Sequence, residues 1–205
     1  MNPAQLNQAI SGALTKLKDH ADQLRDLDQA LGDGDLGITV TAGADAVIAA
    51  LGALDESATP ADIVKACAKA FANANPSTFS ALVAGGLLAG ARTFQDKTDI
   101  SVADAAVFAH AAGEAIAARG KAQLGDKTIL DALMPAADAL AAHLDDAQVA
   151  LECAIEAAGQ AVVSTKDLQS QRGRAAWLQE RSIGLPDPGE TAIWRFLQSW
   201  QAAAT

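Results

Sequence analysis

The chain has 205 residues, of which half are hydrophobic, only 4% are aromatic and 50 are alanine. This composition excludes a disordered chain and argues against a β-sandwich or β-barrel, which would use more β-branched and aromatic residues. The formal net charge of −10 argues against a nucleic-acid-binding protein, because such a protein needs a positive face to displace counterions from phosphates.

Targeting signals and cysteine patterns are missing from the sequence as given. The first residues have neither a basic region nor an apolar core like those of a signal peptide, and no 18-residue stretch is apolar throughout. Cys67 and Cys153 form neither a CxxC pair nor a zinc spacing, and both lie in alanine-rich helical patterns typical of small buried side chains. We therefore expect a cytoplasmic protein with no membrane partner.

Apolar residues recur every three or four positions along most of the chain, as they do on one face of an α-helix. Several of these segments open with helix-start signals. Residues 59–62 (TPAD) offer an N-cap, a proline and an acid, residues 101–104 (SVAD) resemble a capping box, and residues 187–190 (DPGE) repeat the pattern. The predicted helices span residues 3–25, 38–54, 60–74, 77–94, 101–119, 127–143, 146–165 and 189–203.

The arrangement predicted from these segments is all-α. No segment has the alternation of a β-strand, and alanine-rich faces let helix axes pack closely. No shift in composition suggests a linker. We therefore predict one domain over residues 1–205, folded as an antiparallel barrel or bundle of about eight helices. Four segments interrupt the helical pattern, and polar loops of this kind commonly carry function. They are residues 26–37, 72–79, 120–131 and 171–189.

The first interruption contains a cluster of carboxylates. Asp28, Asp33 and Asp35 fall within eight residues and are interleaved with glycines, which allow a tight turn that brings the carboxylates together. Two carboxylates about 4 Å apart repel by roughly 4 kcal/mol at an effective dielectric constant near 20. Proton sharing, an arginine or a divalent cation could offset that repulsion, and an all-oxygen set favours magnesium or calcium. The alternative is a solvated turn between two helices.

A second loop resembles a phosphate-binding loop. Residues 120–128 (GKAQLGDKT) nearly match the P-loop pattern, but Asp126 stands between Gly125 and Lys127, and no strand precedes them. A P-loop fold is therefore excluded. A glycine turn with a lysine and a threonine at a helix start could still hold phosphate oxygens, or Asp126 could be the N-cap of the next helix. The spacing leaves both interpretations open.

Two more loops contain candidate anion ligands. At residues 75–80 (NPSTFS), Ser77 or Thr78 could cap a helix, or the backbone amides there could face an anion. In the last loop, Arg172, Arg174 and Arg181 suit phosphate, although salt bridges to local acids are an equal alternative. The three histidines are isolated in helical patterns, so no nucleophile with a base partner can be assigned from the sequence.

Three segments together resemble the L subunit (DhaL) of dihydroxyacetone kinases, which is the nucleotide-binding half of that enzyme. They are residues 27–40 (LDQALGDGDLGITV), 119–133 (RGKAQLGDKTILDAL) and 173–193 (GRAAWLQERSIGLPDPGETAI), and they occur in the family's order across nearly the whole chain. The resemblance implies a barrel of eight antiparallel helices, with ADP or ATP bound at one end through two Mg²⁺ ions.

The resemblance also implies roles for individual residues. The metal ligands would be Asp28, Asp33 and Asp35. Residues 36–39 would wrap the phosphates, Arg174 would lie on the phosphate side, and no residue would be a nucleophile. The implied nucleotide-binding residues are Leu36, Gly37, Ile38, Thr39, Pro76, Ser77, Gly120, Ile129, Arg174, Asp187, Pro188 and Gly189.

The same resemblance implies a partner. In this family a separate K subunit holds the hydroxyketone, and the phosphoryl donor is either exchangeable ATP or a phosphotransferase-system protein that recharges bound ADP. A homodimer is one assembly that we consider. The chain departs from the family at Leu36, where relatives often have histidine or threonine, and at Ser77 and Gln179, where glycine is usual. These departures leave the donor and the keto-sugar open. The alternatives are a metal-dependent phosphohydrolase and a non-catalytic regulator with the same fold.

Overall fold

The computed structural model describes residues 1–204, and this part of the chain consists of helices and connecting turns without a strand. In chain order the elements are α1 (Pro3–Leu17), the 3₁₀ turn η1 (Lys18–His20), α2 (Ala21–Leu31), α3 (Leu36–Gly52), α4 (Pro60–Ala74), α5 (Thr78–Thr93), α6 (Val102–Gly120), α7 (Ile129–Ala142), α8 (Ala147–Ser164), the 3₁₀ segment η2 (Ala175–Ser182) and α9 (Pro188–Ala204).

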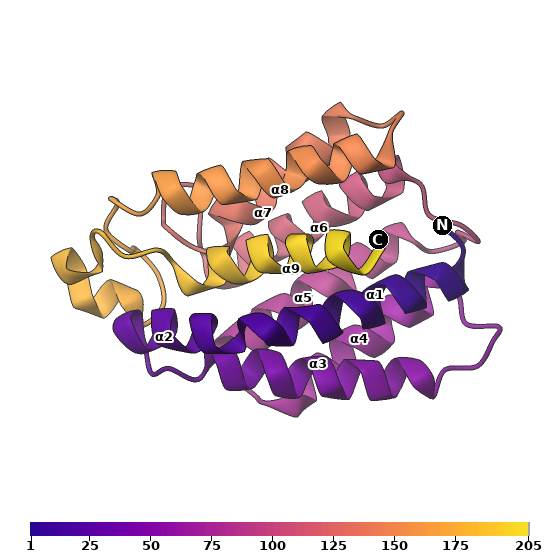
Figure 1. Cartoon of the computed structure of the whole chain (residues 1–205), viewed down its shortest axis with the longest axis horizontal. Helices are drawn as coiled ribbons and strands as arrows, with labels where there is room; N and C mark the ends of the chain where they lie inside the picture. Colours follow the sequence, from indigo (N-terminus) through magenta and orange to yellow (C-terminus); the bar gives the residue numbers. More distant parts are fainter. Residues whose placement is uncertain (205) are drawn as a thin grey trace.

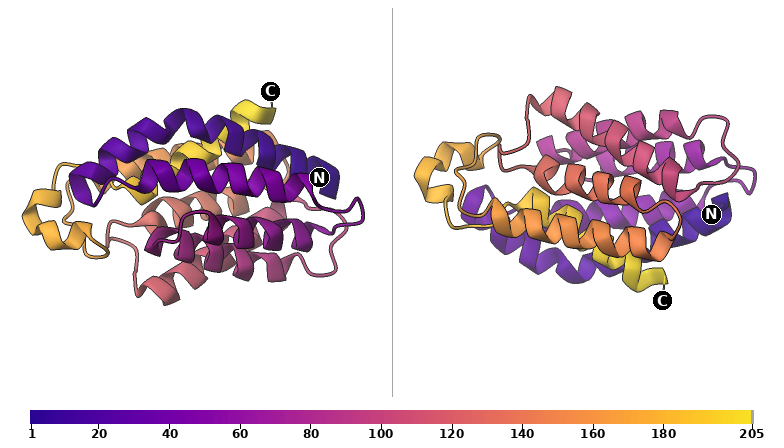
Figure 2. Two further views of the ribbon diagram at one scale, coloured as in Figure 1. Left: turned by 90° about the horizontal axis from the view of Figure 1, so that it is seen from below. Right: turned by 90° about the horizontal axis from the view of Figure 1, so that it is seen from above.

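The helices close into a barrel. Contacts run from α1 to α3, then in chain order through α4, α5, α6, α7 and α8 to α9, which packs back against α1. Because η1 joins α1 and α2 into one bent rod, the ring has eight members, as predicted (Figures 1 and 2). No helix in residues 1–204 combines the length and the apolar character that crossing a bilayer requires.

The up-and-down path gathers four connections at one end of the barrel, which we call the loop end. Helices α3, α5, α7 and α9 begin there, while the N-terminus of the chain lies at the opposite end (Figure 1). Residues 165–187, which we call the cap, connect α8 to α9 and contain η2. The cap extends beyond the barrel and contacts α2 (Figure 1).

Capping residues begin the helices where the sequence predicts. The Thr59 side chain accepts a hydrogen bond from the Asp62 amide and that of Ser101 from the Asp104 amide, and each aspartate bonds back to its partner's amide. These are capping boxes, which typically stabilise a helix by about 1 kcal/mol.

The first helical segment is longer than predicted. It was expected to end at residue 25, but α2 continues to Leu31 and includes Asp28. The connection to α3 is therefore only residues 32–35, rather than the irregular segment 26–37. The buried side chains of Leu24 and Leu31 hold this last stretch of α2 against the barrel, and a stretch of polar residues between them conceals the periodicity.

The two cysteines differ. Cys67 is buried, as expected, and burial raises the pKa of its thiol to about 12. The same expectation is wrong for Cys153, which is half-buried with its Sγ 3.8 Å from Nε2 of His143. Because the turn between α7 and α8 brings these residues together, the ten-residue spacing gave no sign of the contact.

Small residues let neighbouring helices approach closely. A Cβ atom added to Gly43 would lie 2.3 Å from the ring of Phe71, and one added to Gly90 would lie 2.4 Å from the ring of Phe108. Contacts between α3 and α4, and between α5 and α6, thus require the absence of a side chain on one partner. Fully buried alanines have the same role elsewhere in the barrel: Ala132, Ala137, Ala154 and Ala158.

We expect Gly43→Ala to lower the free energy of unfolding by about 1–2 kcal/mol, because the overpacking against Phe71 outweighs the gain in helix propensity. Gly52→Ala is the matched control, since Gly52 lies in the same helix and an added Cβ would meet nothing within 4 Å. Urea unfolding measures both variants. Equal stability of the two would contradict the packing argument.

Candidate functional site

The three predicted metal ligands meet at the loop end. Asp28 lies in the last turn of α2, Asp33 in the short connection and Asp35 at the N-cap of α3. One carboxylate oxygen of each residue lies within 4.8 Å of the others. Oδ2 of Asp28 accepts a hydrogen bond of 3.1 Å from the Leu36 amide, which fixes this side chain against the start of α3.

Glycines make the close approach possible. A Cβ on Gly32 would lie 2.5 Å from Oδ1 of Asp28, so any larger residue would push against that carboxylate. Gly34 has a φ of +76°, in the left-handed region that favours glycine. A Cβ on Gly37 would lie 2.3 Å from the Ala21 carbonyl, so this glycine allows α3 to begin directly against α2.

The cluster is short of positive charge. Arg174, from the cap, forms an ion pair with Asp33, and it is the only cation that forms an ion pair with these carboxylates in the described part of the chain. Burial, with a smaller contribution from the Asp28 charge, raises the pKa of Asp35. A divalent cation can compensate ionised carboxylates of this kind, and oxygen ligands without histidine or cysteine fit Mg²⁺ or Ca²⁺. The donor set therefore fits the implied metal.

The first turn of α3 offers backbone donors beside these carboxylates. Within residues 1–204, no acceptor bonds the amides of Gly37 and Ile38, whereas the Thr39 amide bonds to the Asp35 carbonyl. Free amides at a helix start carry a partial positive charge and suit phosphate oxygens. Leu36 and Gly37 are buried and Ile38 is 62% exposed, so residues 36–38 offer their backbone rather than polar side chains to an anion.

Thr39 is buried, and its hydroxyl oxygen accepts a hydrogen bond of 2.7 Å from the Asn75 side chain. This contact joins the 75–80 turn to α3. Ser77 is the N-cap of α5, where its side chain accepts a hydrogen bond from the Ser80 amide, while Pro76 is exposed. The structure therefore supports the capping interpretation of Ser77. Asn75 was not among the predicted site residues, because an asparagine before proline is a common turn signal.

The 120–128 loop differs from both sequence interpretations. Thr128, not Asp126, is the N-cap of α7, and it forms a capping box with Asp131. Asp126 instead forms a salt bridge of 2.8 Å with Arg172 of the cap. Lys127 is buried, and its Nζ donates to the carbonyls of three cap residues, so it has no hydrogen left for a phosphate.

Three of the predicted nucleotide-lining residues beyond the phosphates lie beside apolar side chains. A Cβ on Gly189 would lie 3.5 Å from Cβ of Ile129, and one on Gly120 would lie 3.6 Å from the Leu82 side chain. Ile129 belongs to a small apolar cluster with Ile116 and Leu130. All three members of this cluster are buried, so Ile129 is part of the packed interior at this end of the barrel.

Two carboxyl groups at the start of α9 have raised pKa values: Asp187, just before the helix, and Glu190, in its first turn. Asp187 accepts a hydrogen bond from the Glu190 amide, and burial raises the pKa of Asp187 to about 6. Pro188 follows as the first residue of α9. Glu190 is fully buried, and burial together with the Asp187 charge raises its pKa to about 9. Sequence reasoning missed Glu190, because an acid in a first helical turn is an ordinary feature.

The contacts of Thr165 support a neutral Glu190. The Thr165 hydroxyl lies 2.9 Å from the Ala161 carbonyl and 2.6 Å from Oε2 of Glu190, and Oε1 of Glu190 has no partner among the described residues. A hydroxyl has one hydrogen and can donate it once. A protonated Glu190 that donates to Thr165, while Thr165 donates to Ala161, satisfies both contacts.

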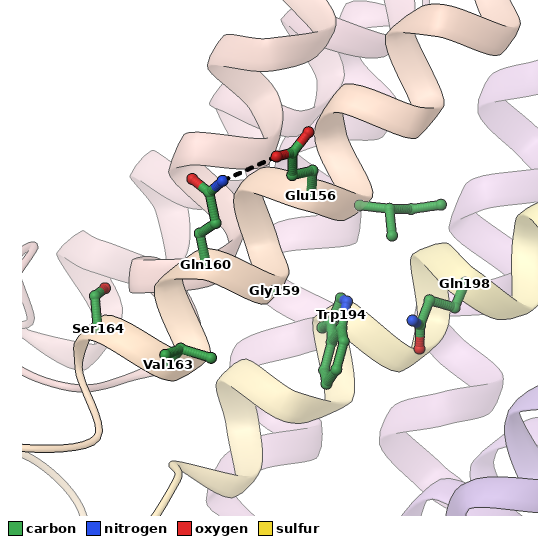
Figure 3. A pocket seen from close by; sticks show the side chains of 8 residues that line it. Glu156, Gly159, Gln160, Val163, Ser164, Trp194 and Gln198 are labelled. Atoms are coloured by element: carbon green, nitrogen blue, oxygen red, sulfur yellow. Dashed lines mark hydrogen bonds between the residues drawn. The ribbon is translucent and has the colours of Figure 1, made fainter.

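A separate groove lies away from these residues, between α8 and α9. It has a volume of about 510 Å³ and is lined by Val163, Trp194 and six other residues (Figure 3). Its only titratable side chain is Glu156, which accepts a hydrogen bond of 3.0 Å from Gln160. With no cluster of titratable or metal-binding groups, this groove offers no chemistry comparable to that of the loop end.

The chain matches one family and several characterised relatives. The family model of the DAK2 domain matches residues 30–202. The chain is 38% identical to L-erythrulose 1-kinase of Mycolicibacterium smegmatis over 83% of its length, and 36% identical to the D-erythrulose kinase of the same organism over 91%. It spans only 30% and 33% of those two proteins.

Shorter relatives match over most of their own length. The chain is 33% identical to the ADP-binding subunit DhaL of PEP-dependent dihydroxyacetone kinase 1 from Listeria innocua, with 85% of this chain and 83% of that protein aligned. It is 28% identical to the corresponding subunit from Escherichia coli, with 90% and 89% aligned. The fold resembles that of dihydroxyacetone kinase from C. freundii, solved with AMP-PNP and Mg²⁺, at a TM-score of 0.73 and 20% identity over 97% of this chain and 34% of that chain.

Because Glu190 takes up a proton on folding, its contribution to stability is present below about pH 4.5 and is lost as the pH rises towards 9. We expect Glu190→Gln to be more stable than the wild type by about 2 kcal/mol near pH 8, and to gain less at pH 5. Chemical unfolding across this range measures the slope. The exposed control Glu114→Gln should keep the wild-type dependence of the free energy of unfolding on pH. If Glu190→Gln also keeps that dependence, the raised pKa of Glu190 is contradicted.

Gln179 has φ +51° and ψ −126°, a conformation that is strained for any residue except glycine. We expect Gln179→Gly to raise the free energy of unfolding by about 1 kcal/mol, because relief of strain exceeds the entropic cost of glycine. Glu180→Gly, one residue along the same exposed segment, has no such strain and should be destabilising. Thermal unfolding compares them, and a destabilised Gln179→Gly variant would rule out the strain.

Proposed function

The chain belongs to the DAK2 domain family, and from this premise and the geometry of the loop end we propose that it is the nucleotide-binding part of a kinase for short-chain keto-sugars. It binds ADP or ATP with Mg²⁺ and transfers a phosphoryl group to dihydroxyacetone or a related hydroxyketone such as erythrulose. The observation that carries this proposal is the juxtaposition of Asp28, Asp33 and Asp35 with the free amides that begin α3.

Each group at the loop end has a role in this proposal. Asp28, Asp33 and Asp35 hold two Mg²⁺ ions, which when bound neutralise phosphate charge. The amides of residues 37 and 38 donate to phosphate oxygens, and the exposed guanidinium of Arg174 adds the bidentate contact that phosphate favours.

The remaining residues serve the rest of the nucleotide. Gly120, Ile129 and Gly189, which lie beside apolar side chains, line the position of the base, and residues 187–189 form the turn against it. Leu36, Thr39, Pro76 and Ser77 support the phosphate side, with Thr39 acting through Asn75 rather than by direct contact.

We propose a partner for the acceptor. No nucleophile with a base is among the proposed site residues, and phosphoryl transfer needs mainly positioning and charge neutralisation. A separate K-type subunit or domain therefore holds the keto-sugar and presents its hydroxyl to the nucleotide. Relatives named as PEP-dependent subunits and relatives named as erythrulose kinases have comparable similarity to the chain, so recharging of bound ADP by a phosphotransferase-system protein and exchange of ATP are both compatible with it.

Calorimetry with ADP and Mg²⁺ tests whether the three clustered carboxylates bind the nucleotide and its metal ions. We expect the triple variant Asp28→Ala, Asp33→Ala, Asp35→Ala to lose at least about a hundredfold in affinity, because several charge-assisted contacts disappear at once. Substitution of Asp19, Asp45 and Asp145 by alanine removes the same charge from exposed positions outside the cluster and should leave affinity unchanged.

Three results would overturn the proposal. They are unchanged affinity in the cluster variant, an equal loss in the control, and hydrolysis of a phosphoester by the purified chain alone in place of transfer. Native mass spectrometry adds a direct reading of stoichiometry, for which we expect one nucleotide and two Mg²⁺ ions per chain.

A further inference from the structure

Lys127 joins both ends of the cap to the barrel. Its Nζ donates to the carbonyls of Lys166 and Leu168 at 2.9 Å and to that of Ser182 at 2.8 Å. The first two acceptors lie where the cap leaves α8, and the third lies where the cap returns towards α9. One ammonium group thus uses all three hydrogens on segments that are 39, 41 and 55 residues away in the sequence.

Asp126 adds a second connection next to the first. Its backbone carbonyl accepts a hydrogen bond from the Gln171 amide at 3.0 Å, and its carboxylate forms a 2.8 Å salt bridge with Arg172. The two ends of the cap are also joined to each other, because the Gly184 amide donates to the Lys166 carbonyl at 2.9 Å. Residues 126 and 127 therefore hold the beginning and the end of the cap in one place.

The burial of Lys127 indicates that these contacts are specific. The residue is 1% exposed, and a buried ammonium is costly unless its donors are satisfied. Its φ of +61° lies in the left-handed region, which an ordinary side chain adopts only when the surroundings hold it there. Burial lowers the pKa of Lys127, and the charges of the nearby Asp187 and Asp167 oppose that shift and favour its charged form.

The cap has one side chain that reaches the candidate metal site, which is Arg174 in its ion pair with Asp33. Arg174 lies two residues after Arg172, the second of the two cap residues that Asp126 holds. We propose that Asp126 and Lys127 are positioning residues that fix the cap so that Arg174 stands at the carboxylate cluster, and that Lys127 contacts no phosphate itself. This proposal rests on the proposed function only for its effect on nucleotide binding.

Hydrogen exchange of the free protein tests the positioning without any ligand. In Lys127→Met, which keeps the aliphatic stem and removes the donors, amides in residues 166–184 should exchange about tenfold faster or more, because charge-assisted hydrogen bonds are lost. Residues 78–120, in α5 and α6, should keep their wild-type rates. Unchanged exchange in the cap, or equal acceleration in both regions, would overturn the proposal.

A milder pair of variants covers the case in which Lys127→Met does not fold. Arg172→Gln breaks the salt bridge to Asp126 at a half-exposed position and should accelerate exchange in the cap. Arg181→Gln removes the same charge from the same cap, at a residue that forms no ion pair or side-chain hydrogen bond within residues 1–204. It should leave exchange in the cap unchanged. Equal exchange in these two variants would overturn the proposal.

A double-variant cycle on ADP·Mg²⁺ affinity separates positioning from a general loss of stability. If Lys127 acts through Arg174, Lys127→Met together with Arg174→Ala should bind no more weakly than Arg174→Ala alone. Losses that multiply would show that Lys127 acts independently and would overturn the proposal. If the wild type does not bind ADP·Mg²⁺, the proposed function fails, while the exchange experiment still decides how the cap is held.

Discussion

Electrostatic repulsion among three carboxylates is the constraint on which the organisation of the loop end depends. At a separation of 4.8 Å and an effective dielectric constant near 20, each pair of ionised groups repels by about 3 kcal/mol. The chain nevertheless holds Asp28, Asp33 and Asp35 together, through the Leu36 amide, the ion pair to Arg174 and glycines that leave room for the carboxylates. Such an arrangement is costly alone, and divalent cations with a polyphosphate would relieve the repulsion in the function that we propose.

The barrel explains why this cluster can be held in place. Helices that alternate in direction bring the starts of α3, α5, α7 and α9 to one end, where segments distant in sequence meet beside the cap (Figure 1). Alanine and glycine at the helix contacts keep the axes close, as at Gly43 and Phe71. The rigid part of the molecule is therefore its packed wall, and the polar groups lie on short connections between helix ends.

The sequence predicts the fold well, because apolar stripes and capping residues are local signals. Thr59 and Ser101 begin helices as expected. The three closely spaced aspartates, interleaved with glycines, were expected to meet, and their carboxylates do lie together. What the sequence could not provide depends on contacts between distant segments. The carbonyl partners of Lys127 come from the cap, the salt-bridge partner of Asp126 is Arg172, and the burial of Glu190 follows only from the way α9 packs. The helical position of Asp28 was missed for the opposite reason, since polar neighbours hid the end of α2.

The most direct test of this account is the free energy of unfolding of the wild type and of a variant with asparagine at positions 28, 33 and 35, each measured in EDTA and in ADP with Mg²⁺. The account predicts that the asparagine variant is the more stable protein in EDTA, where repulsion is relieved, and the less stable one with ligand, where only the wild type gains binding energy. The account would be contradicted if the wild type were more stable than the asparagine variant in EDTA and gained no stability from ADP and Mg²⁺.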